Sequence, residues 1–255
     1  MKIINRPFLK FIYSCLLCSV PQYSMNPLNQ NRILAELNVK PYSTYINYRL
    51  NNTQVSILNN YIKNYSEDLE IVPIKLSKYD YPHYYLSINI YNATSPIMMT
   101  NNDLIRCELN TYIKTSDGIL GTLILDYVSN TLSMDPINVF KSSINNIKFI
   151  NDIELNKLYV NSKQDKILLD LKYKLTKDDF YISQKLVEFT DLAYYKNGVA
   201  DKVYYDSTLG NADTKYGELL DGSVFKYREM EFYNPDSVFY FDNSLNFIGS
   251  MWNNL

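Results

Sequence analysis

The sequence contains few of the residues on which common metal, redox and disulfide sites depend. Its 255 residues include one histidine, three cysteines, seven glycines and one tryptophan. The cysteines, Cys15, Cys18 and Cys107, are too few and too scattered for a zinc ribbon or a disulfide scaffold, and His83 alone cannot build a histidine-rich metal centre. We therefore expect neither a metal ion nor a cofactor.

An excess of positive charge is also missing. Lysine and arginine number 25 against 27 aspartates and glutamates, which gives a formal net charge of −2. A nucleic-acid partner is not expected, because proteins that bind nucleic acids electrostatically present a basic surface. The chain also lacks the Gly-x-Gly-x-x-Gly, Walker, Gly-x-Ser-x-Gly and His-Glu-x-x-His motifs, so the sequence lacks the signatures of the common nucleotide-binding, hydrolase and zincin classes.

The apolar run near the N-terminus is short. Basic residues precede the mostly apolar segment 11–20, and Pro21 ends it. This outline is typical of a secretory signal or a short membrane anchor, but a disordered or surface-packed leader has the same outline. The segment is too short to cross a bilayer, because about 20 apolar residues are needed. We assign residues 1–25 to this leader. Membrane association is expected only if it is an anchor, and a cytoplasmic location is favoured over a secretory one.

Apolar and aromatic residues are plentiful in the rest of the chain. Hydrophobic residues make up 46% and aromatic residues 15% of the sequence, with 25 tyrosines. The tyrosine enrichment is typical of an AT-biased genome. This content is ample for a packed core, and no linker is visible, so we assign residues 26–255 to one domain.

Short strands dominate the pattern in this domain. The predicted helices cover 53–65, 135–143 and 183–190, and the segment 207–222 is predicted to be a long loop. The predicted strands cover 69–76, 84–92, 104–114, 120–128, 147–160, 167–175, 194–206, 224–233 and 237–241. Asp117-Gly118 between two of them is a hairpin signal. The pattern predicts a mainly β protein with minor α, namely a single antiparallel β-barrel or sandwich with a few short helices.

One strand carries a row of polar residues on one face. Arg106, Glu108 and Asn110 alternate with Cys107 and Leu109, and alternate side chains of a strand share a face. Three polar groups in a row on a central strand face either water or a polar cavity.

Lys141 is the other residue with a candidate chemical role. A lysine becomes a Schiff-base nucleophile when desolvation or a neighbouring cation lowers its pKa. Lys141 lies near the end of the predicted helix over 135–143, where a solvated lysine is the alternative interpretation.

Several stretches, taken in order, resemble the acetoacetate-decarboxylase-like β-barrel superfamily. They are Leu69-Glu70-Ile71-Val72-Pro73 after the helix, the strand 106–112, and the segments 123–130, 188–198, 202–207, 235–241 and 249–252. The resemblance covers roughly residues 40–255 and is greatest to uncharacterised branches, including fungal hypothetical proteins.

This resemblance implies a barrel with an enclosed pocket for a small carbonyl or carboxylate compound, and lysine Schiff-base chemistry of the decarboxylase or lyase type. The decarboxylase uses a buried lysine, a neighbouring lysine that lowers its pKa, a strand glutamate and an arginine. Glu108 matches the glutamate's place and Lys141 falls near the lysine pair, although Ser142 follows it instead of a second lysine. We therefore take Lys141 and Glu108 as catalytic candidates, and Arg106 and Asn110 as substrate-binding candidates.

Two other functions fit the same sequence. A noncatalytic barrel could hold a lipid-like or aromatic ligand among tyrosine and methionine side chains such as Met98 and Met99. A structural or interaction protein would have its interior filled by side chains. A cavity lined by Lys141 and Glu108 would favour the enzyme, an apolar cavity the binding protein, and no cavity the scaffold. The expected partner is a small molecule, and the resemblance allows a homo-oligomer.

Overall fold

The computed structural model describes residues 33–63, 68–94, 104–130, 148–152, 157–163, 167–190, 192–195 and 202–251. Residues 33–255 form one compact unit. The predicted leader over 1–25 and the predicted helix over 135–143 lie outside the described residues.

Strands make up most of this unit, as the sequence predicts. They are β1 (Ile33–Val39), β2 (Ser43–Arg49), β3 (Leu69–Ile71), β4 (Tyr85–Thr94), β5 (Leu104–Thr115), β6 (Leu120–Ser129), β7 (Lys148–Asp152), β8 (Lys157–Lys163), β9 (Ile167–Asp179), β10 (Leu192–Tyr195), β11 (Lys202–Ser207), β12 (Thr214–Leu219), β13 (Val224–Tyr227), β14 (Met230–Phe232), β15 (Ser237–Phe241) and β16 (Leu245–Met251). The described helices are α2 (Asn52–Lys63), α3 (Gln184–Thr190) and the 3-10 turn η1 (Leu209–Asn211). In the described part of the chain, no helix has the length and apolar content to cross a membrane.

The strands form one continuous, mostly antiparallel sheet that is not closed. Its path runs β14-β13-β9-β12-β15-β2-β4-β1-β16-β11-β10-β6-β5-β3, with β7 attached through β8 to β9. The prediction of an antiparallel sheet is confirmed, with one exception: β10 pairs with β6 in parallel. Because β14 and β3 end the path without a second neighbour, the sheet keeps free edges that a closed barrel would lack.

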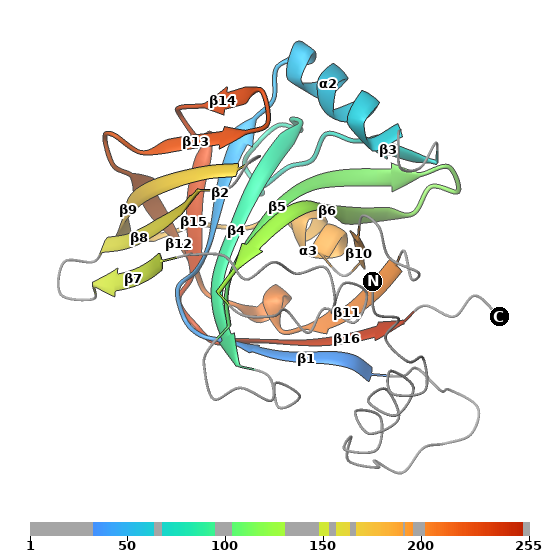
Figure 1. Ribbon diagram of the computed structural model, residues 1–255. Coiled ribbons are helices and arrows are strands. Elements are labelled where there is room, and N and C mark those ends of the chain that lie inside the picture. Colours follow the sequence, from blue (N-terminus) through green and yellow to red (C-terminus); the bar gives the residue numbers. More distant parts are fainter. Residues whose placement is uncertain are drawn as a thin grey trace, which may run out of the picture. The chain divides into compact units, whose positions relative to one another are not determined.

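Part of the sheet nevertheless curls around an interior space. Strand β4 pairs with β2 and β5 along its length and with β1 at its end. From β1 the hydrogen-bonded path continues through β16, β11, β10 and β6 and returns to β5, as Figure 1 shows. Two hydrophobic clusters use opposite faces of the strands: Ile88 and Leu109 belong to one, and Tyr45 and Tyr112 to the other.

Local sequence signals explain the elements that were predicted well. Helix α2 begins at a capping box, in which Gln54 N donates to Asn51 Oδ1 at 2.9 Å and Asn51 N donates to Gln54 Oε1 at 3.0 Å. Leu58 and Ile62 fall one turn apart on its buried face. The β5–β6 hairpin turns at Gly118, whose φ of +86° suits a residue without a Cβ.

Two of the predicted long strands are antiparallel pairs instead: the predicted strands over 147–160 and 224–233 correspond to β7 and β8 and to β13 and β14. The predicted strand segment 194–206, in which Asn197-Gly198 marks a hairpin or loop, corresponds to the antiparallel pair β10 and β11. Between β13 and β14 the chain reverses at Arg228, which adopts a φ of +55°. The predicted strand over 69–76 contains only the short β3, and β1 and β16 were not predicted at all.

The predicted long loop over 207–222 is wrong, because this segment contains η1 and β12. Gly217 lies inside β12, which pairs with β9 and β15. A Cβ at this position would lie 2.7 Å from Val238 Cγ1 and 3.5 Å from Lys174 O. The glycine therefore allows close packing across the sheet, and it does not mark a turn.

Substitution Gly217→Ala is expected to lower the free energy of unfolding by about 1–3 kcal/mol, the usual cost of overpacking. Val238 is buried, so its methyl group cannot move aside freely. Urea denaturation measures the effect. In a Val238→Ala background the cost should shrink, and Gly210→Ala is the matched control, because its new Cβ would meet Val187 Cγ1 at an ordinary 3.6 Å. Equal losses for the two glycine substitutions would contradict the explanation.

Candidate functional site

The polar row on β5 faces an interior cavity and not open water. Arg106, Glu108 and Asn110 are 3%, 8% and 3% exposed. Because directly opposed residues of an antiparallel pair share a face, the register places Asn89 of β4 beside Glu108 and Tyr45 of β2 beside Asn89. A row of polar side chains thus crosses three neighbouring strands.

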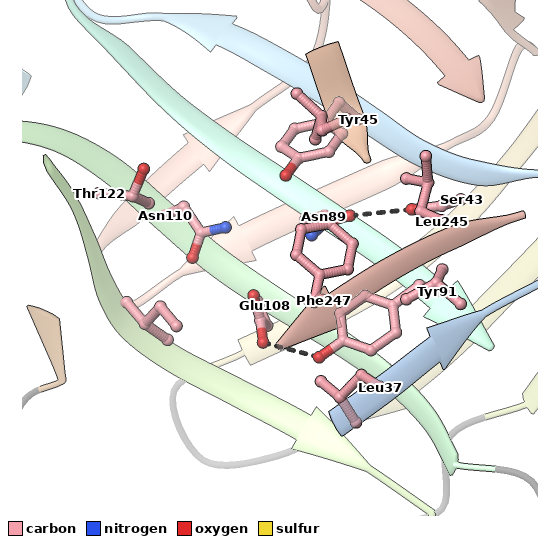
Figure 2. A pocket seen from close by; sticks show the side chains of 13 residues that line it. Leu37, Ser43, Tyr45, Asn89, Tyr91, Glu108, Asn110, Thr122, Leu245 and Phe247 are labelled. Carbon is pink, nitrogen blue, oxygen red and sulfur yellow. Dashed lines mark hydrogen bonds between the residues drawn. The ribbon is translucent and has the colours of Figure 1, made fainter. Parts of the chain in front are cut away.

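This row forms one wall of a small pocket (Figure 2). The space open to the centres of water-sized molecules is about 70 Å³, several times the roughly 10–15 Å³ that one water needs and below the about 300–1,000 Å³ of pockets for drug-sized ligands. The pocket is lined by Leu37, Val39, Ser43, Tyr45, Asn89, Tyr91, Glu108, Asn110, Thr122, Ile124, Leu209, Leu245 and Phe247. Polar groups of β2, β4 and β5 therefore face apolar groups of β1 and β16 across a space fit for a ligand of few heavy atoms.

Glu108 is held in place by two partners. Arg106 Nε lies 2.8 Å from Glu108 Oε1, and the Tyr91 hydroxyl donates a hydrogen bond of 2.9 Å to the same oxygen. The Arg106 guanidinium also lies 4.1 Å from the centre of the Tyr127 ring, a favourable position for a cation. Arg106 is not among the lining residues, so its contact with the pocket runs through Glu108.

A hydrogen-bond network fixes the strands beside the pocket. Ser87 Oγ donates to Asn47 Oδ1 at 2.7 Å and lies 3.2 Å from the Tyr112 hydroxyl. Asn47 Nδ2 in turn donates to Ser237 Oγ at 3.2 Å. All but Ser237 are buried, and a buried network whose members are paired holds neighbouring strands in one register.

Polar groups on three residues that face the pocket contrast with this network. Asn110 Oδ1 is buried and has no hydrogen-bond partner among the described residues. Within the same part of the chain, the structure gives no hydrogen bond to the amide nitrogens of Asn89 and Asn110 or to the Tyr45 hydroxyl. Figure 2 shows these groups and the second carboxylate oxygen of Glu108 directed toward one space. Most buried polar groups are paired, so this cluster is the candidate place for a ligand to form hydrogen bonds.

Burial disfavours ionisation of the Tyr45 phenol. Loss of hydration, and then the nearby Tyr112 and Glu108, raise the pKa of Tyr45 well above its ordinary value. The hydroxyl is protonated at neutral pH, as in any tyrosine, and can donate a hydrogen bond into the pocket.

The structure brings some of the predicted site residues together. Glu108 and Asn110 line the pocket, and Arg106, which is not a lining residue, forms an ion pair with Glu108. Lys141, Met98 and Met99 lie outside the described residues. Among the residues that are described, no group of three or more histidine, cysteine, aspartate or glutamate side chains could hold a metal ion.

Tyr45 and Asn89 were missed by the sequence analysis. Asn89 lies on the predicted strand 84–92 and Tyr45 on β2, and only the register between β2, β4 and β5 brings them beside Glu108. With 25 tyrosines in the chain, no composition or spacing signal distinguishes Tyr45 from the others.

No family model and no curated protein matches the sequence. Among solved structures, the chain is similar to an acetoacetate decarboxylase-like enzyme from Sphingomonas wittichii RW1, with a TM-score of 0.53 and 9% sequence identity over 91% of this chain and 98% of that one. A structure described as acetoacetate decarboxylase gives a TM-score of 0.49 and 9% identity over 90% and 93% of the two chains. At this identity the first likeness concerns the fold and not the chemistry. The chain therefore has an acetoacetate-decarboxylase-like fold.

Proposed function

We propose that the pocket binds a small compound that carries a carbonyl or carboxylate group. The observation that carries this proposal is the buried Asn110 Oδ1, which has no hydrogen-bond partner among the described residues, in a pocket also lined by Tyr45, Asn89 and Glu108. A buried polar group without a partner costs about 1–3 kcal/mol. A ligand N–H or O–H group that donates to Asn110 Oδ1 would remove that cost, and a carbonyl or carboxylate oxygen of the ligand would accept from the amide nitrogens of Asn89 and Asn110 and from the Tyr45 hydroxyl.

The opposite wall suits the apolar part of such a compound. This wall consists of aliphatic and aromatic side chains from β1 and β16, namely Leu37, Leu245 and Phe247. Small-molecule sites typically combine a mostly apolar lining with a few placed polar groups. A short alkyl chain would contact this wall while its oxygen faces Asn89 and Asn110.

Binding can be tested by ligand-observed NMR with acetoacetate, acetoacetamide, butanone and butyrate. At least one of these compounds should show saturation transfer that disappears in the variant Asn110→Leu. The matched control is Asn38→Leu, which replaces an exposed asparagine of β1 and should leave binding intact. If no compound of the series binds to the wild-type protein, the proposed function is wrong.

The chemistry that we propose for this pocket is Schiff-base formation on Lys141, and it is supported by the resemblance of the sequence. The neutral amine adds to the ketone carbon of a β-keto acid, and water leaves to give a protonated imine. The bond to the carboxylate carbon then breaks, its electron pair moves to the imine nitrogen, and carbon dioxide departs. A proton returns to the carbon of the resulting enamine, and water releases the ketone and the amine. Glu108 is proposed to position the substrate or to carry this proton.

Borohydride reduction tests the imine step directly. After incubation with acetoacetate and borohydride, we expect intact-mass analysis and peptide mapping to find one reduced adduct on Lys141. An isopropyl group there would mean that carbon dioxide was lost before reduction, whereas a group that retains the carboxylate would mean that it was not. The variant Lys141→Gln should remain unmodified. An unmodified wild-type protein, beside a positive control that reacts, would contradict the imine mechanism and leave ligand binding as the function.

A further inference from the structure

We infer that a second site, a groove between helix α2 and the β13–β14 hairpin, binds a small organic carboxylate with an apolar body, whose carboxylate Arg228 holds. Figure 1 shows α2 and this hairpin at the same end of the sheet. The groove has a space of about 300 Å³ open to the centres of water-sized molecules, and its lining includes Ile57, Tyr61, Arg228, Glu229 and Met230. It shares no lining residue with the pocket at Glu108, so this inference is independent of the function proposed above.

Arg228 has a backbone conformation that suits glycine. Tyr227 and Met230 are paired, so Arg228 and Glu229 form a two-residue turn, and Arg228 has a φ of +55°. Glycine, asparagine and aspartate are usual at the first position of such a turn, because a Cβ is unfavourable at positive φ. Strained backbone of this kind is often found at binding sites. Formation of the turn alone does not explain an arginine here.

The Arg228 guanidinium has only neutral partners in the described part of the chain. It lies 3.8 Å from the centre of the Tyr61 ring, and its Nη2 donates a hydrogen bond to the Tyr61 hydroxyl. Its other neighbour is Tyr227, whose ring centre is 5.5 Å away. Both phenols are uncharged at pH 7. Arg228 Nε is buried without a hydrogen-bond partner, and no described carboxylate forms an ion pair with this guanidinium, which is therefore a held cation without a counter-charge.

Two carboxylates near Arg228 restrict the charge of the ligand. Glu229 is exposed and lines the groove, and Asp126 Oδ2 accepts a hydrogen bond of 3.3 Å from the Tyr227 hydroxyl. Like charges repel. A ligand with one negative charge is repelled less than a phosphate ester, which carries nearly two at pH 7.

A carboxylate with an apolar body matches the remaining features of the groove. A guanidinium has five N–H donors in a planar fork, of which Tyr61 uses one, and this fork fits the two oxygens of a carboxylate. The carbon atoms of Ile57, Leu58 and Met230 form an apolar lining beside it. Small-molecule sites combine such a lining with a few polar groups, and the volume reaches the lower end of their usual range of about 300–1,000 Å³.

The test compares benzoate with benzamide, which have the same number and arrangement of non-hydrogen atoms and differ in charge. NMR of protein labelled at the methionine methyl groups follows Met230, whose signal is identified by its loss in Met230→Leu. None of the described residues that line the pocket at Glu108 is a methionine, so this signal reports on the groove. Titration at pH 7 should shift it with a dissociation constant for benzoate at least tenfold lower than that for benzamide.

Variants of the hairpin assign the binding to Arg228. Arg228→Gly should weaken benzoate binding at least tenfold and leave benzamide unaffected, and it should fold, because glycine suits the positive φ. Lys226→Gln is the matched control: it removes the same charge from the same hairpin, where Lys226 pairs with Glu231 outside the groove, and should change the affinity less than twofold. Glu229→Gln should strengthen the binding of phenyl phosphate more than that of benzoate.

A second variant keeps the inference testable if Arg228→Gly does not fold. Arg228→Lys keeps the charge but loses the planar fork, so benzoate should bind several-fold more weakly. The inference is overturned if benzoate leaves the Met230 signal unchanged, if it binds no more tightly than benzamide, or if a folded Arg228 variant binds it as tightly as the wild-type protein. Tighter binding of phenyl phosphate than of benzoate to the wild-type protein would also overturn it, because the site would then select phosphate.

Discussion

The variant Arg106→Met is expected to lose about 3–5 kcal/mol of its free energy of unfolding at pH 7, which is the usual cost of removing one partner of a buried ion pair. The Arg106 and Glu108 side chains are only 4% and 10% exposed. Methionine fills much of the space of the arginine stem but leaves the Glu108 carboxylate buried without its counter-charge. Urea denaturation at pH 7, followed by circular dichroism, measures the loss.

Two further variants separate charge from packing in this experiment. In Arg106→Met/Glu108→Gln neither charge of this pair remains, so most of the lost stability should return. Arg49→Met breaks the Arg49–Asp236 pair, which has the same 2.8 Å separation but side chains 50% and 26% exposed, and should cost less than about 1 kcal/mol. A double variant as unstable as Arg106→Met would show that Arg106 stabilises the protein through packing alone.

The variant Asn110→Leu is expected to be more stable than the wild-type protein by about 1–2 kcal/mol and to lose ligand binding. Leucine has the same number and branching of non-hydrogen side-chain atoms as asparagine, and it removes a buried amide oxygen that no described residue satisfies. Sites that bind ligands often keep such unfavourable groups at the expense of stability. Urea denaturation without ligand measures the first effect, and ligand-observed NMR measures the second.

Asn47→Leu provides the contrast for this prediction. Asn47 is as deeply buried as Asn110, but its amide accepts a hydrogen bond from Ser87 and donates one to Ser237. Its replacement should destabilise the protein by about 1–3 kcal/mol, since it leaves two hydroxyl groups without their partner. A loss of stability in Asn110→Leu comparable to that in Asn47→Leu would mean that the Asn110 amide is satisfied within the protein.

The elements that the sequence predicted are those set by local chemistry. The α2 helix and the β5–β6 hairpin were both predicted, and the capping box of Asn51 and Gln54 and the turn at Gly118 that stabilise them act within a few residues of sequence. The strands β1 and β16 were missed because each is stabilised by the other, with Val39 opposite Leu245. A short stretch of sequence contains only one of the two paired strands, so its pattern alone does not show the pairing.

The candidate site, too, was predicted only as far as local sequence determines it. The alternation of Arg106, Glu108 and Asn110 correctly placed them on one face of β5, but alternation alone is equally compatible with water and with a cavity. Burial on that face comes from the curl of the sheet, in which β4 pairs with β1, β2 and β5. Tyr45 and Asn89 lie beside Glu108 because of the register between strands, and the spacing of side chains within one strand does not predict that register.

From the pairing of β1 with β16 we expect the pocket to form late during folding. The polar wall lies on strands β2, β4 and β5, of which β4 and β5 are neighbours in sequence, whereas the apolar wall needs β1 and β16 from distant parts of the chain. Contacts between distant segments carry a large loop-closure cost and tend to form late. A folding intermediate with β4, β5 and β6 in place would thus expose Glu108 and Asn110 to water, and capacity to bind ligand would appear only with the final docking of β16.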